Sequence, residues 1–202
     1  MDTFDAIYQR RSIKQYDTNH RLGDAEITKL LEAAIQSPTS FNIQHWRFVV
    51  VTDAALRAEI RAAAYNQAQV TESSVLFVMT ADIKAWKKNP ARYWQHAPKD
   101  VADFLVGWMG PYHEGNEQLQ RDEGMRSIGM AMQTLMLAAK AMGYDSCPMI
   151  GFEADKVAKL INLPIDHVIG PMVAVGKGTK PAWPKPGQLP LNEVMVRNKF
   201  PG

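Results

Sequence analysis

Three side chains near the start of the chain, in the stretch "YQRRSIKQYD" over 8–17, have the chemistry to bind an anion together. In extended backbone, alternate residues point the same way, so Arg10, Ser12 and Lys14 share one side of the chain. They offer a guanidinium fork, a hydroxyl and an ammonium, a set that suits a phosphate with a polar chain attached. The same cations also suit the end of a short helix, whose dipole favours positive charge there. The residues alone leave both interpretations open.

Other motifs carry less chemistry. The stretch "SPTSFNIQHW" over 37–46 is rich in donors and acceptors, but ordinary turn chemistry explains it and it predicts no ligand by itself. In "GPMVAVGKG", a glycine follows Lys177 where a nucleotide-binding phosphate loop has Ser or Thr. The five histidines show no paired ligand spacing, so no metal site is predicted. Cys147 has no activating base next to it in the sequence and is expected to be a small core residue.

Length and composition limit the class of protein. A chain of 202 residues suits one domain, and a net charge of +2 argues against a general nucleic-acid binder. A single cysteine excludes an intrachain disulfide and favours a reducing, cytoplasmic setting. The N-terminus has no secretory pattern, and no segment has the roughly 20 apolar residues that would span a bilayer. We therefore expect a cytoplasmic protein without a nucleic-acid or membrane partner.

The apolar patterns predict a mixed α+β chain with helices flanking a sheet. Helices are expected over 2–10, 24–37, 53–70, 116–142 and 154–161, and strands over 46–52, 73–81, 144–152 and 168–176. Asp2 or Thr3 is the expected cap of the first helix and Asp24 that of the second, which Ser37-Pro38 should end. The helix over 116–142 is apolar around most of its girth, so it should be buried centrally or between subunits.

Two segments do not fit this alternation. Residues 84–115 hold six large aromatic side chains and three prolines, which predicts short helical pieces that form a lid or a second small core. Residues 177–202 are rich in proline and too irregular for the core, so we expect a tail that drapes over a partner subunit. The chain shows no internal repeat and no interdomain linker.

Four blocks appear in order along the whole chain: "QRRSIKQYD", "AIQSPTSFNIQHWRFVVV", "AAKAMGYDSCPMIGF" and "VGKGTKPAWPKPGQLPL". Together they resemble the nitroreductase family of flavin enzymes, and its small bacterial members most closely. The resemblance implies an α+β homodimer with a central, mostly antiparallel sheet, exchanged C-terminal tails and one FMN in each of two interface sites. It also implies an oxidoreductase that passes hydride from NAD(P)H through FMN to nitroaromatics, quinones or similar acceptors by a ping-pong mechanism.

The resemblance also implies which residues contact FMN. They are Arg10, Arg11, Ser12, Lys14, Pro38, Thr39, Ser40, Asn42, Asn66, Gln69, Pro148, Met149, Ile150, Gly151 and Lys185. The phosphate and ribityl chain would lie at Arg10 and Ser12, and the pyrimidine edge of the ring at Lys14. Residues 38–42 would come from the partner subunit, and a backbone N–H of 149–151 would point at the reactive nitrogen N5. The flavin carries the chemistry, so no catalytic side chain is expected.

A substrate cover is expected from aromatic residues, namely Phe41, Tyr93, Phe104 and Trp108. Arg11, on the other side of the backbone, is the member of the first cluster expected to be structural. Gln69 stands where some relatives have a lysine, and Gln188 where many have an arginine that clamps the phosphate. Lys177 and Lys180 are therefore alternatives to Lys185 at the phosphate.

Three other functions stay open from the sequence. The first is a flavin-binding or flavin-sensing protein without turnover. The second is a flavin dehydrogenase of an unidentified metabolite. The third, a cofactor-free anion-binding domain, is what the first cluster would suggest without the other three blocks.

Overall fold

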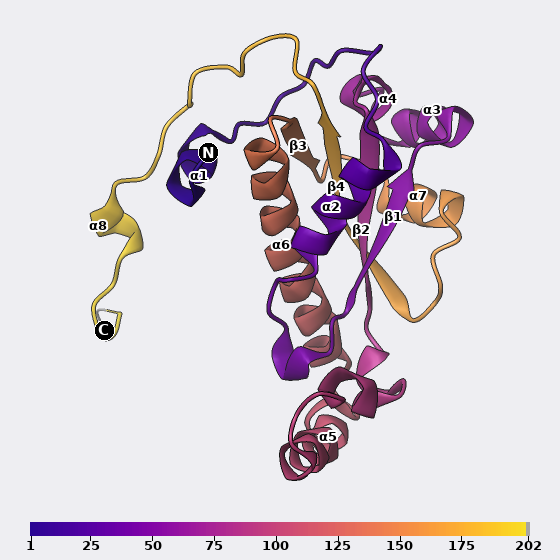
Figure 1. The fold of residues 1–202 in the computed structure, drawn as a ribbon, viewed down its shortest axis with the longest axis vertical. Helices are drawn as coiled ribbons and strands as arrows, with labels where there is room; N and C mark the ends of the chain where they lie inside the picture. Colours follow the sequence, from indigo (N-terminus) through magenta and orange to yellow (C-terminus); the bar gives the residue numbers. More distant parts are fainter. Residues whose placement is uncertain (201–202) are drawn as a thin grey trace.

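A four-stranded sheet forms the centre of the molecule in the computed structural model, which describes residues 1–200 (Figure 1). Its strands are β1 (Trp46–Val51), β2 (Val75–Asp82), β3 (Asp145–Met149) and β4 (His167–Gly176). They lie in the order β1-β2-β4-β3, and every neighbouring pair is antiparallel. The predicted α+β class and the antiparallel character of the sheet are confirmed.

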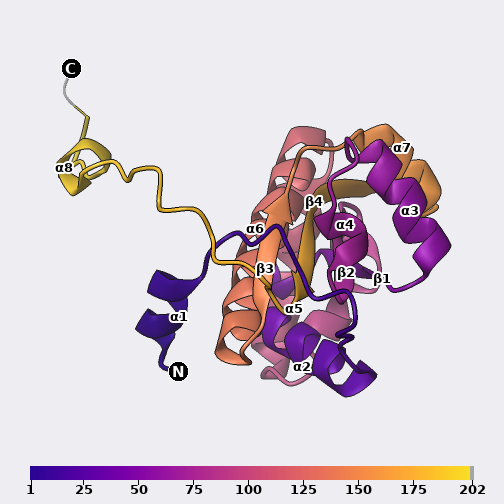
Figure 2. The same ribbon diagram turned by 90° about the horizontal axis from the view of Figure 1, so that it is seen from above.

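Helices cover both faces of this sheet (Figures 1 and 2). They are α1 (Thr3–Gln9), α2 (Asp24–Ala34), α3 (Ala54–Ala63), α4 (Gln69–Glu72), α5 (Lys99–His113), α6 (Glu117–Ala141), α7 (Ala154–Leu160) and α8 (Leu191–Val194). Three short 3-10 helices are η1 (Ser40–Asn42), η2 (Ala85–Lys87) and η3 (Pro90–Trp94). α2 and α6 pack on one face of the sheet, and α3 and α7 on the other. No helix within residues 1–200 is both long and apolar enough to span a membrane.

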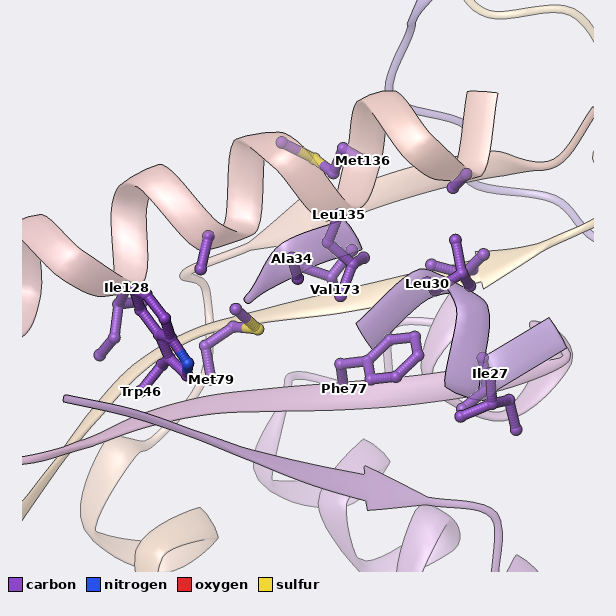
Figure 3. Close-up of a cluster of buried hydrophobic side chains, with 14 of the residues drawn as sticks. Ile27, Leu30, Ala34, Trp46, Phe77, Met79, Ile128, Leu135, Met136 and Val173 are labelled. Carbon is purple, nitrogen blue, oxygen red and sulfur yellow. The ribbon is translucent and has the colours of Figure 1, made fainter. Parts of the chain in front are cut away.

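The two cores meet at β2, whose eight residues are all buried. On one face Phe77 packs with Leu30 of α2 and Leu135 of α6 (Figure 3). On the other face Leu76 belongs to a second core, with Ile60 of α3. Because strand side chains alternate between faces, one continuous apolar run can serve both layers. The long helix over 116–142 is confirmed as α6, and it is buried against this sheet.

The predicted helix over 53–70 is wrong, because α3 ends at Ala63. Tyr65 and Asn66 adopt left-handed backbone, with φ of 54° and 56°. The Asn66 N–H donates to the carbonyl of Arg61 at 3.0 Å, which closes the helix end. Asparagine tolerates this conformation better than most residues, so the chain turns here and starts again as α4.

The ends of elements account for the remaining differences. The strand predicted over 144–152 is too long, because β3 ends at Met149 and the chain turns where the Phe152 N–H donates to the Ile150 carbonyl. Asp2 caps α1 as predicted and accepts the N–H of Asp5 at 2.8 Å. Gly23 rather than Asp24 is the cap of α2, and its N–H donates to the Glu26 carboxylate at 2.9 Å. That helix ends at Ala34, three residues before the predicted end.

The segment 84–115 forms η2, η3 and α5, which lie together beyond one end of the sheet (Figure 1). Short pieces were expected, but α5 is 15 residues long and contains Pro111. Lys88 fixes the start of the segment through ion pairs with Asp82 at 2.8 Å and Asp166 at 2.5 Å. At the other end of the chain, the tail leaves the body of the molecule beyond Trp183, whose carbonyl still accepts from Arg11, and α8 lies apart from it (Figure 2).

A buried histidine joins β1 to α6 and makes stability depend on pH. His45 is fully buried, and its Nδ1–H donates to the hydroxyl of Ser127 at 3.0 Å, since that hydroxyl donates onward to the Glu123 carbonyl. Burial, aided by the neighbouring His113, lowers the pKa of His45 to about 4. In the unfolded chain a histidine titrates near pH 6.5, so protons bind the unfolded state first as pH falls.

We expect the free energy of unfolding to decrease by up to about 3 kcal/mol between about pH 7 and pH 4 through His45. The His45→Gln variant, which cannot titrate there, should show a flatter pH dependence in urea unfolding at these two pH values. His96→Gln, at an exposed position, is the control and should keep the wild-type slope. A wild-type slope in His45→Gln would contradict this role.

Candidate functional site

The first cluster lies along the outer edge of β3. Ser12 and Ser146 form a parallel β-bridge, and the Ile13 N–H donates to the Ser146 carbonyl at 3.1 Å. Because the bridge is parallel, the segment from Ser12 to Lys14 runs in the same direction as β3. Four residue steps of extended chain span about 13 Å, so the main-chain atoms of Arg10 and Lys14 lie about that far apart, at opposite ends of the segment.

The two cations lie on the same side of this segment. Burial raises the pKa of the Cys147 thiol, and the positive charges of Lys14 and Arg10 both act against that rise. Arg11 instead donates to the carbonyl of Trp183 and lines a different cavity with Lys180. The alternation expected from the sequence therefore holds.

Two polar atoms at the Arg10 end are buried without a partner. They are Nη1 of Arg10 and Oγ of Ser146, and neither has a hydrogen bond within residues 1–200. A buried donor left unpaired costs about 1–3 kcal/mol, so such atoms mark a place that a ligand can satisfy. A guanidinium N–H and a hydroxyl both donate to phosphate oxygens, so these residues fit an anionic group at this end.

Residues 66–69 bond to the turn that follows β3. Gln67 Nε2 donates to the Gly151 carbonyl at 2.7 Å, and Gln69 Nε2 donates to Gln67 Oε1 at 3.0 Å. The exposed Ile150, with 82% of its surface accessible, lies next to this contact. The structure thus brings 66–69 and 149–151 together, just beyond β3, the strand with which residues 12–13 pair. Sequence reasoning missed Gln67, because its segment was read as a continuous helix.

The loop 38–42 belongs to a different part of the chain. Asn42 Nδ2 donates to the Tyr93 carbonyl at 2.8 Å, and Trp94 Nε1 donates to the Phe41 carbonyl at 3.0 Å. Phe41 also packs on Tyr112, with ring centroids 5.4 Å apart. In Figure 1 this loop and α5 lie at the lower end of α6, while the segment after α1 runs past its upper end. One chain therefore does not unite the two groups of predicted residues.

The predicted cover residues differ in exposure. Phe104 and Trp108 are 64% and 53% accessible on α5, with ring centroids 6.3 Å apart. Tyr93 is half-buried, and its hydroxyl donates to the Ala85 carbonyl at 3.2 Å. Of the four predicted cover residues, Phe104 and Trp108 are the ones with widely exposed rings.

On the tail, Lys185 is exposed. The Trp183 ring lies closer to the cluster, with its centroid 5.8 Å from Lys14 Nζ. No sequence pattern singles out Trp183, since a tryptophan in a proline-rich tail has no predictable neighbour.

A close approach of two chain segments positions the cluster. Tyr16 pairs with Gly178, and the Asp17 N–H donates to the Lys177 carbonyl at 2.8 Å. A Cβ atom at Gly176 would lie 2.8 Å from the Ser74 nitrogen and 3.0 Å from the Tyr16 ring. The segment can cross the end of β4 only because a glycine stands there.

Comparisons with known proteins show which proteins the chain resembles. Residues 7–177 match the model of the nitroreductase family. The chain is 59% identical to protein DrgA of Synechocystis sp. over 204 residues, which cover 98% of this chain and 97% of that protein. It is 33% identical to YodC of Bacillus subtilis, a provisionally assigned NAD(P)H nitroreductase, with 96% and 97% covered. A provisionally assigned nitroreductase from Exiguobacterium sibiricum, solved in complex with FMN, is 30% identical with a TM-score of 0.90, and 97% of each chain is covered.

We expect Gly176→Ala to lower the free energy of unfolding by about 1–3 kcal/mol, because the new methyl group meets backbone that cannot move aside. Gly129→Ala is the matched control, since its Cβ would meet open space on the exposed side of α6. That change should stabilise the helix by up to about 1 kcal/mol. Urea unfolding of both variants measures the difference, and equal stabilities would refute the close approach.

Proposed function

Because the chain belongs to the nitroreductase family, we propose that it is an FMN-dependent NAD(P)H oxidoreductase that reduces nitroaromatics, quinones or similar electron-poor acceptors. The FMN bound to the relative from E. sibiricum and the NAD(P)H nitroreductase assignment of YodC support this proposal. When bound, FMN takes hydride from NAD(P)H and then passes electrons to the acceptor in a ping-pong cycle. The chain itself then supplies binding, orientation and charge.

One observation carries the proposal: Arg10 Nη1 and Ser146 Oγ are buried and unpartnered at one end of a line that has Lys14 at the other. Arg10 and Ser12 would hold the phosphate and ribityl chain. Lys14 would place its charge at the pyrimidine edge of the ring, where negative charge develops on reduction. Ile150 and Gly151 would lie along the ring.

A homodimer completes this proposal. Large apolar side chains are exposed on α1, α2, α6 and the tail, namely Phe4, Ile7, Tyr8, Ile35, Met130, Trp183, Leu189, Leu191, Val194, Met195, Val196 and Phe200. Exposed apolar surface of this extent favours an interface with a second copy of the chain. The partner would bring residues 38–42 and the α5 aromatics to each site, and the tails would cross between subunits.

The proposal is tested on the purified protein. It should show flavin absorbance or take up added FMN, and it should oxidise NADH or NADPH steadily when menadione or a nitrobenzene derivative is present. Arg10→Ala should weaken FMN binding roughly ten- to hundredfold, as expected for lost bonds to a charged group, and riboflavin binding much less. The control is Arg121→Ala, at an exposed position on α6.

Each outcome has a distinct meaning. Absence of flavin uptake would refute the proposal outright. Flavin binding without turnover would favour the flavin-sensing alternative, and equal losses for FMN and riboflavin would remove Arg10 from the phosphate.

Heterodimers test whether two chains share one site. We expect Arg10→Ala and Ser40→Tyr, the latter chosen to block the loop, each to weaken FMN binding in their own homodimers. In a mixed dimer, purified with two different affinity tags, one site would carry both changes and the other neither. One tightly bound FMN per heterodimer is therefore expected from absorbance titration. If the loop served its own chain, both sites would carry one change, and tight binding would be lost.

A further inference from the structure

The chain makes a tight turn directly after β3, centred on Gly151. The Phe152 N–H donates to the Ile150 carbonyl at 3.1 Å, which is the bond of a γ-turn. The Gly151 carbonyl accepts from Gln67 Nε2 at 2.7 Å. Both carbonyls are therefore occupied, while the Gly151 N–H has no partner within residues 1–200 and Gly151 is exposed. The turn presents a free backbone donor at the surface.

The side chain that holds this turn is itself held in one orientation. Gln67 Oε1 accepts from Nε2 of Gln69, a residue only 4% accessible. The Gly151 carbonyl can only accept, so the amide group of Gln67 must turn its nitrogen toward it. Arg61 fixes the preceding turn by donating to the Asn66 carbonyl at 3.3 Å and to the Thr71 hydroxyl at 2.8 Å. Gln67 is therefore a fixed donor.

The free N–H lies at the Lys14 end of the candidate site. From the parallel Ser12–Ser146 bridge, the segment to Lys14 runs in the same direction as β3, and the turn begins directly after β3 ends at Met149. Ile150, 82% accessible, flanks the same turn with an apolar side chain. A cation, an apolar surface and a single backbone donor thus occupy one end of the site.

We propose that Gln67 is a positioning residue: by bonding the Gly151 carbonyl, it holds the turn so that the Gly151 N–H donates to N5, the reactive nitrogen of bound flavin. This inference rests on the proposed function, because it requires the flavin ring beside Lys14. A hydrogen-bond donor that is already held in place does not have to move during electron transfer. A donor on a loosely held turn first has to be brought into position. Gln69 acts one step further out, by orienting Gln67.

The test uses Gln67→Met, which removes the amide group at similar volume, in protein loaded with FMN labelled with ¹⁵N at N5. The N5 resonance should move downfield, as expected when a donor to that nitrogen is lost. The rate constant of hydride transfer from NAD(P)H should fall about tenfold, the effect of one weakened hydrogen bond. One FMN per chain should remain bound.

A second readout does not need the cofactor. In the FMN-free protein, the Phe152 amide should exchange its hydrogen faster in Gln67→Met, because the turn is no longer held. Gln69→Met should change the N5 resonance and the Phe152 exchange rate in the same directions by smaller amounts. This variant replaces Gln67→Met in the test if Gln67→Met does not fold. Gln118→Met is the control, since Gln118 lies on α6 and bonds only Asp122 there, at 2.7 Å.

The outcomes separate this inference from the function on which it rests. An unchanged N5 resonance and hydride-transfer rate in FMN-loaded Gln67→Met would overturn the role of Gln67 and leave the oxidoreductase proposal standing. An unchanged Phe152 exchange rate would overturn the hold on the turn. Wild-type protein that binds no FMN would overturn the proposed function itself.

Discussion

The pairing of residues 12–13 with Ser146 is the contact on which the candidate site depends. β3 is an edge strand of the sheet, and an open edge leaves backbone donors and acceptors without partners. The segment after α1 covers that edge and takes an extended form in doing so. Extended backbone is what sets Arg10 and Lys14 on one side and Arg11 on the other. The same bonds that protect the sheet edge therefore arrange the cations.

Stability and chemistry come from separate parts of the molecule. The two cores on either face of β2 bury apolar side chains almost completely, and the cations of the site belong to neither core. The rigid scaffold in turn allows the rim to keep groups that do not contribute to folding. A guanidinium nitrogen and a hydroxyl stay buried without partners, and a glycine N–H stays free. Buried side-chain nitrogens of His45, Trp86 and His113 also lack partners, but they lie around η2 and α5, away from the two cations. An unpartnered guanidinium nitrogen beside a second cation is what an anionic ligand would satisfy.

Features that depend on residues close together in the sequence could be predicted, whereas features that depend on contacts between distant residues could not. Strands β1 and β2 and helix α6 were predicted from apolar patterns, because burial acts on each segment by itself. The end of the helix before Tyr65 and Asn66 was not predicted. No glycine marks the turn, and the free-energy difference between this turn and a continued helix of good helix-forming residues is small. The contact of Gln67 with Gly151 joins residues 84 positions apart, and no local pattern predicts it. The meaning of Arg10 was ambiguous for the same reason: a helix end and an anion site differ only in what lies across from them.

The arrangement of the chain makes the proposed dimer a condition of the proposed site. Ser37 and His45, which flank the loop 38–42, bond to Thr134 and Ser127 within α6, and the loop itself bonds to the segment that leads into α5. The Arg10 segment bonds instead to Ser146 of β3, the strand that follows the other end of α6. α6 is a single uninterrupted helix of 25 residues, so no hinge within it can bring the two groups together. A cofactor that draws on both groups must therefore lie between two chains, and the exposed aromatic side chains of α5 then face the site of the partner rather than their own.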